Sequence, residues 1–236
     1  MLVLMQDRFV GDIGDFSKYG LLRALAGVHP QKTPELSLGI VWYRVPDVGI
    51  EYLDDDSDAF RPRDPALFDA LKGLVQSNQR TIATIARTSI WPSDTRFSDL
   101  RATRRVTSKS PDPWLERTAA EVRGCGLVFL DPDTGLENRS KDMCSREHCS
   151  YKDVRRFWDE GASLVIYQQQ AQRKGQAEQM AAVANDLFEV VKTRPWFLHF
   201  NRRTFFVIPS PRHHDILETR FQQFAEDWGH HLKTRN

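Results

Sequence analysis

The chain has 236 residues, and its 33 lysines and arginines are balanced by 32 aspartates and glutamates. This balance gives no overall electrostatic attraction to nucleic acid, so any such contact must come from a local basic patch. No apolar run reaches the roughly 20 residues that a membrane span needs, and three cysteines provide no disulfide framework. We therefore expect a cytoplasmic protein with no membrane partner, folded as a single domain over residues 1–236.

The first pattern in chain order predicts a helix that begins near Asp15 and carries apolar residues from Phe16 to Leu25. Asp15 has the side chain of a helix N-cap. Lys18 would then lie in the first turn, where a cation opposes the helix dipole. This conflict suggests a partner for Lys18, either an anionic ligand or an aspartate at a strand end. The alternative is a solvated lysine on an exposed face.

The next segments alternate between apolar strands and amphipathic helices. Residues 38–43 predict a buried strand, so that Tyr43 and Asp47 come to a strand end. A helix follows from Pro65, capped by Asp64, and further helices are expected over residues 81–87 and 113–123. Residues 89–113 show no clear pattern but hold several basic side chains. Together with the pair at 202–203 they form the candidate patch for RNA or DNA: Arg101, Arg104, Arg105, Lys109, Arg202 and Arg203.

The most informative segment runs from Gly126 to Glu137. Five apolar residues lead directly into Asp131-Pro132-Asp133-Thr134-Gly135, as in a buried parallel strand that delivers polar groups to the rim of a sheet. Ligands of open α/β sheets bind outside the carboxyl ends of the strands, so we expect Asp131 and Asp133 in a site. The alternative is a turn in which both aspartates accept local backbone N–H groups.

The remaining chain extends the same architecture. Residues 163–167 predict another buried strand, which ends in polar residues that include Gln168 and Arg173. Cys144, His148 and Cys149 lack a second ligand pair nearby, so we expect no structural metal site. Helices are expected over residues 151–160, 175–192 and 214–228, and an antiparallel hairpin over 196–208. The predicted fold is α/β and Rossmann-like, with a mostly parallel sheet, helices on both faces and a C-terminal antiparallel hairpin.

Two motifs carry a resemblance to known proteins. Residues 14–19 (Gly-Asp-Phe-Ser-Lys-Tyr) and 130–133 (Leu-Asp-Pro-Asp) resemble motifs of the ribosomal-RNA large-subunit adenine-N6 methyltransferases, with Asp15, Lys18 and Asp131 as the matching positions. Those enzymes carry Gly-Asn-x-Ala-Asp-x-x-Lys-His and a strand-end Asp-Pro-Pro-Tyr. Over most of its length the chain also resembles an uncharacterised bacterial family with the patterns Gly-Asp-x-Gly-Asp-x-x-Lys-Tyr and Asp-Pro-Asp-x-Gly-Leu.

The resemblance implies an S-adenosylmethionine-dependent methyltransferase-like protein that acts on nucleic acid. In this interpretation Asp131 orients the methyl acceptor, with Asp133 beside it, and Lys18 helps to position the cofactor or the acceptor. Asp47 is expected to hold the ribose of the cofactor. The full set of expected cofactor-binding residues is Asp15, Asp47, Tyr43 and Gln168.

Two other functions stay open. Asp131, Asp133 and Glu137 could hold Mg²⁺ in a divalent-metal phosphodiesterase or nuclease, with Lys18 or Arg173 stabilising phosphoryl charge. The chain could also be a non-catalytic binding module on a degenerate methyltransferase scaffold. This second alternative is favoured by the single late glycine in the turn after the first strand, and by Asp133-Thr134 where the resembled enzymes have proline and an aromatic residue.

Overall fold

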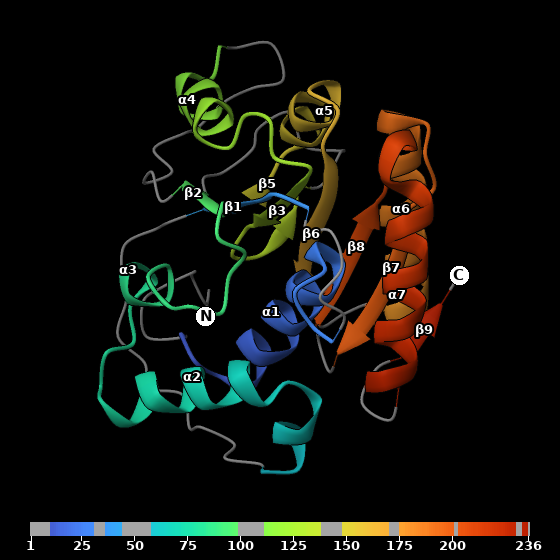
Figure 1. Ribbon diagram of the computed structural model, residues 1–236. Helices are drawn as coiled ribbons and strands as arrows, with labels where there is room; N and C mark the ends of the chain where they lie inside the picture. Colours follow the sequence, from blue (N-terminus) through green and yellow to red (C-terminus); the bar gives the residue numbers. More distant parts are fainter. Residues whose placement is uncertain are drawn as a thin grey trace.

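The computed structural model describes residues 10–30, 36–43, 58–98, 111–137, 148–169, 175–200, 203–229 and 233–235. Its centre is a mostly parallel sheet with strand order β2-β1-β3-β6-β8-β7-β9 (Figure 1). The strands are β1 (Leu38–Trp42), β2 (Arg96–Ser98), β3 (Leu127–Asp131), β6 (Ser163–Gln169), β7 (Trp196–Phe200), β8 (Arg203–Ile208) and β9 (Lys233–Arg235). A separate small sheet pairs β4 (Gly135–Leu136) with β5 (His148–Cys149).

The pairing confirms the predicted strand directions. β1 pairs in parallel with both β2 and β3, and β3 pairs in parallel with β6. β8 then inserts antiparallel between β6 and β7, so the predicted C-terminal hairpin is present. All five residues of β1 and of β3 are buried, which explains why neither sequence shows the apolar–polar alternation of a half-exposed strand. Asp131, at the end of β3, is the only charged residue in these two strands.

Helices cover both faces of the sheet, as predicted. One face packs against α1 (Ile13–Ala26), α2 (Pro65–Gln76), α3 (Ile82–Ile85) and α7 (His214–Trp228). The opposite face packs against α4 (Pro113–Glu121), α5 (Tyr151–Asp159) and α6 (Gln176–Val191). Two short 3-10 helices complete the described elements, η2 (Asp58–Arg63) and η3 (Pro211–His213). Among the described helices, none is long and apolar enough to cross a membrane.

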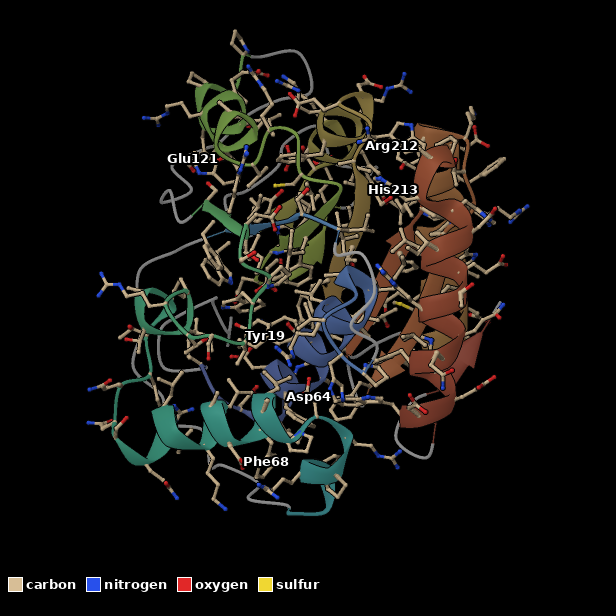
Figure 2. All side chains as sticks on the ribbon, in the orientation of Figure 1. Tyr19, Asp64, Phe68, Glu121, Arg212 and His213 are labelled. Atoms are coloured by element: carbon tan, nitrogen blue, oxygen red, sulfur yellow. The ribbon has the colours of Figure 1, made fainter. Side chains whose placement is uncertain are left out.

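Helix α1 is buried on all sides, and Figure 2 shows Tyr19 on it in the interior of the molecule. The prediction that Asp15 is its N-cap was wrong. Asp12 is the cap, and its Oδ1 accepts from the backbone N–H of Asp15 at 2.7 Å. The helix begins earlier because Gly11, at φ +92°, turns the chain just before it. Lys18 therefore lies in the second turn, beyond the strongest part of the helix dipole.

Other local predictions hold with small shifts at their ends. Asp64 caps α2 and accepts from the backbone N–H of Leu67 at 3.1 Å, and Pro65 is the first helical residue. The unpatterned region 89–113 contains β2, which was not predicted. With three residues at the edge of the sheet, this strand is too short to give a periodic signal.

Candidate functional site

The topology of the sheet reverses between β1 and β3. From β1 the chain runs outward to β2, and it then returns to pair β3 with the other side of β1. Ligands of open α/β sheets bind in the crevice outside the carboxyl ends of the strands at such a switch point. Asp131 is the last residue of β3 and pairs in register with Trp42, the last residue of β1. The central predicted site residue thus lies at this position.

A buried ammonium group holds the Asp131 carboxylate in place. Lys18 Nζ, on α1, lies 2.9 Å from Asp131 Oδ2 and 2.8 Å from Asp15 Oδ1. The side chains of all three residues are less than a tenth exposed. The other oxygen of Asp15, Oδ2, accepts from the backbone N–H of Gly11 at 3.0 Å. Of the alternatives left open for Lys18, the structure shows a strand-end aspartate as its partner, and Lys18 is not a solvated surface lysine.

Burial and charge act against each other in this cluster. Burial raises the pKa of Asp131 to about 6, although Lys18 acts to lower it. Burial also raises the pKa of Asp15, again against the effect of Lys18. For Lys18 itself, burial would lower the pKa, but the two carboxylates outweigh burial and raise the pKa well above its ordinary value. Lys18 is therefore charged at neutral pH, and Asp131 changes its charge in the mildly acidic range.

The two oxygens of the Asp131 carboxylate differ in their hydrogen bonding. Within the described part of the chain, Oδ2 receives the hydrogen bond from Lys18, whereas no group donates to Oδ1. An ionised carboxylate can accept several hydrogen bonds through its two oxygens. A donor N–H or O–H from a bound molecule would therefore complete the environment of a carboxylate that the protein already holds rigidly.

A second ion pair joins the start of α1 to the same edge of the sheet. Arg203, the first residue of β8, donates from Nη2 to Asp12 Oδ2 at 3.0 Å. The guanidinium lies directly against Gly14, where a side chain would collide with it. Because β8 is antiparallel, Arg203 is paired with Gln169 at the carboxyl end of β6. Sequence reasoning missed the pairing of Asp12 with Arg203, which joins residues 191 positions apart.

Two predicted cofactor ligands serve the protein itself. The Tyr43 hydroxyl donates to Asp153 Oδ2 at 2.8 Å, and its ring packs against Trp114 on the sheet face opposite to Lys18. Gln168 Oε1 accepts from the backbone N–H of Leu136 at 2.8 Å, so it holds the loop that follows Asp131. These side chains support the strand ends, and the structure does not bring them together with Lys18 and Asp131.

The acidic residues after Asp131 do not gather with it into a metal site. Asp133 is buried beyond the same strand end, but Glu137 Oε1 accepts from the backbone N–H of Tyr151 at 2.9 Å, at the start of α5. Among the described residues there is no group of three or more histidine, cysteine, aspartate or glutamate side chains suited to a metal ion. Cys149 is a buried free thiol in β5.

Several predicted residues lie outside the described ranges. These are Asp47, Arg173, Cys144, and the basic residues Arg101, Arg104, Arg105, Lys109 and Arg202. Of the predicted basic patch, the structure describes Arg203, and Asp12 already pairs with its guanidinium.

The comparisons with known proteins add no relative. No family model, no curated protein and no solved structure matches the chain.

Proposed function

We propose that the protein is an S-adenosylmethionine-dependent methyltransferase whose acceptor is a nitrogen that carries hydrogen, with nucleic acid as the expected acceptor class. The proposal rests on the Asp131 carboxylate, which is 2 % exposed. Lys18 donates a hydrogen bond to its Oδ2, whereas none of the described residues donates one to its Oδ1. Such an oxygen can accept from an amino group and orient its nitrogen.

The strand layout supports the same proposal. A Rossmann-like methyltransferase of the kind that the sequence resembles alternates strands and helices and ends in an antiparallel hairpin. Among the described residues, β2, β1, β3 and β6 pair in parallel, and β8 is inserted antiparallel between β6 and β7. Asp131 is also the last residue of the strand at the switch point, and the resemblance implies that the acceptor binds there.

The charges of the site favour a hydrogen-bond donor over an anionic acceptor. Asp12, Asp15 and Asp131 supply three negative charges when ionised, against two positive charges from Lys18 and Arg203. An amino group can donate to Asp131 without adding charge, whereas an oxyanion would meet a net negative surrounding. Because the pKa of Asp131 is about 6, its fully accepting form predominates above that pH.

The described residues are better suited to binding the methyl acceptor than to binding S-adenosylmethionine. Asp15, Tyr43 and Gln168, three of the predicted cofactor ligands, already hydrogen-bond within the protein. The fourth, Asp47, follows β1 outside the described ranges. S-adenosylmethionine would supply an electrophilic methyl group. The part that we assign to this chain is to hold and orient the nitrogen through Asp131 and to fix that carboxylate through Lys18.

Calorimetric titration with S-adenosylmethionine tests the proposal, with Mg²⁺ and Mn²⁺ titrated separately. We expect saturable cofactor binding that Asp47→Ala abolishes and Asp131→Asn leaves intact, because Asp131 acts on the acceptor. No cofactor binding, together with metal binding that Asp131→Asn removes, would replace the proposal with a metal-dependent phosphodiesterase. No binding of either ligand would leave a non-catalytic binding module.

A further inference from the structure

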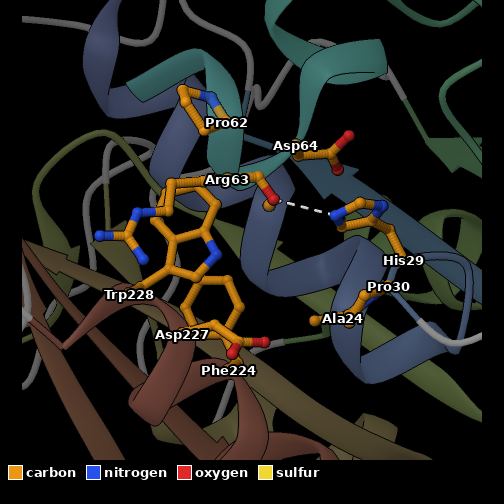
Figure 3. A pocket seen from close by; sticks show the side chains of 10 residues that line it. Ala24, His29, Pro30, Pro62, Arg63, Asp64, Phe224, Asp227 and Trp228 are labelled. Atoms are coloured by element: carbon orange, nitrogen blue, oxygen red, sulfur yellow. Dashed lines mark hydrogen bonds between the residues drawn. The ribbon is translucent and has the colours of Figure 1, made fainter. Parts of the chain in front are cut away.

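A cavity lies between α1, η2 and α7 (Figure 3). Its volume is about 330 Å³, within the range of small-molecule sites. Gly20 and Ala24 leave the α1 side of the cavity without bulky side chains, and the stacked rings of Phe224 and Trp228 form one wall. None of Asp15, Lys18 and Asp131 lines it.

Two opposite charges border this cavity without neutralising each other. Arg63, at the end of η2, forms no ion pair or side-chain hydrogen bond in the described part of the chain. Asp227, on α7, accepts at Oδ1 from Gln223 Nε2 at 3.1 Å and has no cationic partner there. Figure 3 shows Arg63 and Asp227 among the labelled side chains that line the cavity.

Two other polar side chains of the cavity, Asp64 and His29, already interact within the protein. Asp64 is fully buried and pairs with Arg23 Nε at 2.6 Å, so its charge is neutralised within the protein. His29 Nε2 lies 2.9 Å from the backbone carbonyl oxygen of Arg63. Since a carbonyl can only accept, Nε2 carries the hydrogen, and in the neutral ring Nδ1 is left as an acceptor. This bond also fixes the backbone from which the Arg63 side chain extends.

We propose that this cavity binds a free amino acid with an apolar or aromatic side chain. The carboxylate of the amino acid would pair with Arg63 and its ammonium group with Asp227, while the side chain contacts the wall of Phe224 and Trp228. A simple anion or a simple cation would satisfy one of these charges and leave the other without a partner. A zwitterion satisfies both, and guanidinium–carboxylate pairing is the stronger of the two contacts.

Calorimetric titration with single L-amino acids tests the inference. Phenylalanine is compared with phenethylamine, which lacks the carboxylate, and with 3-phenylpropionate, which lacks the amine. We expect saturable binding of at least one apolar or aromatic amino acid, with both single-charge analogues weaker by about tenfold or more. Arg63→Gln and Asp227→Asn should each weaken binding to a similar extent.

The matched controls are Arg212→Gln and Asp215→Asn, which remove charges from exposed residues next to or on α7 that do not line the cavity. Circular dichroism of each variant checks that it is folded. Binding that persists in both Arg63→Gln and Asp227→Asn, equal affinity for the single-charge analogues, or no binding by any apolar or aromatic amino acid would overturn the inference. Because the ligand and the variants differ from those of the strand-end site, failure here leaves the proposed methyltransferase function unaffected.

Discussion

Replacing Lys18 with methionine should destabilise the protein strongly at neutral pH. The change removes the cation that lies 2.8 Å from Asp15 and 2.9 Å from Asp131, and all three side chains are less than a tenth exposed. Loss of one member of a buried ion pair leaves an uncompensated charge in the interior and costs about 3–5 kcal/mol of unfolding free energy. Lys18→Met leaves two such carboxylates, so we expect a cost in the upper part of this range at pH 7.5.

The stability cost of Lys18→Met should depend on pH in a definite direction. Burial raises the pKa of Asp131 from 3.8 to about 6 even with Lys18 present, and this difference corresponds to about 3 kcal/mol. A carboxylate whose pKa is raised in the folded state binds protons more tightly in the folded protein than in the unfolded chain. Its ionisation therefore lowers the unfolding free energy: this loss is absent below about pH 4 and grows as the pH rises to about 6. Without Lys18 both carboxylates have still higher pKa values. The cost of Lys18→Met should therefore be smaller at pH 5 than at pH 7.5.

Urea unfolding at both pH values measures this difference. The control is Lys192→Met, which removes a lysine from an exposed pair with Glu189, where both side chains are more than half exposed. Such a surface pair contributes about 0–1 kcal/mol. A loss below about 1 kcal/mol for Lys18→Met at pH 7.5, or a loss that does not decrease at pH 5, would refute the account of a buried, charge-compensated site.

Four further substitutions extend these tests, three of them to residues outside the Lys18 cluster. Asp131→Asn should flatten the fall in unfolding free energy between about pH 4 and pH 6, as measured by urea unfolding across that range. Gly135→Ala should lower the unfolding free energy by more than about 1 kcal/mol, because φ is +104° and the new Cβ would lie 2.5 Å from Gln168 Oε1. Its control is Gly73→Ala, in an open helical position, which should instead raise the unfolding free energy by about 0.5–1 kcal/mol. Asp64→Asn should cost about 3–5 kcal/mol in thermal or urea unfolding, because a buried guanidinium loses its counter-charge.

The sequence predicts the sheet and the centre of the site because both depend on strong local patterns. The runs at 127–130 and 164–166 are continuously apolar, so they were recognisable as buried strands, and the aspartate after the first was expected at a strand end. The sequence suggested a partner for Lys18 because it placed this lysine in the first turn of the helix. The partner is present, although α1 begins at Ile13 and Lys18 lies in the second turn. In the structure this partner is Asp131, which lies 113 residues after Lys18 in the sequence.

The remaining site residues depend on geometry that the sequence does not fix. Asp12 and Asp15 are both good N-caps three residues apart, and the choice depends on the backbone of Gly11. Tyr43 follows Trp42 directly, so its side chain points to the opposite face of the sheet. The face of each residue is set by the register of β1 with β3, and a one-residue slip would exchange the two faces.

The most direct test of the central claim is transfer of a radiolabelled methyl group from S-adenosylmethionine to RNA and, separately, to DNA at pH 7.5. The account predicts incorporation by the native chain that falls by a factor of about 100 or more in Asp131→Asn, because the amide keeps the shape of the side chain but loses its charge and half of its accepting oxygens. The matched control, Asp215→Asn, should retain full incorporation. Equal incorporation by the native chain and Asp131→Asn, or none by the native chain with either nucleic acid, would contradict the account.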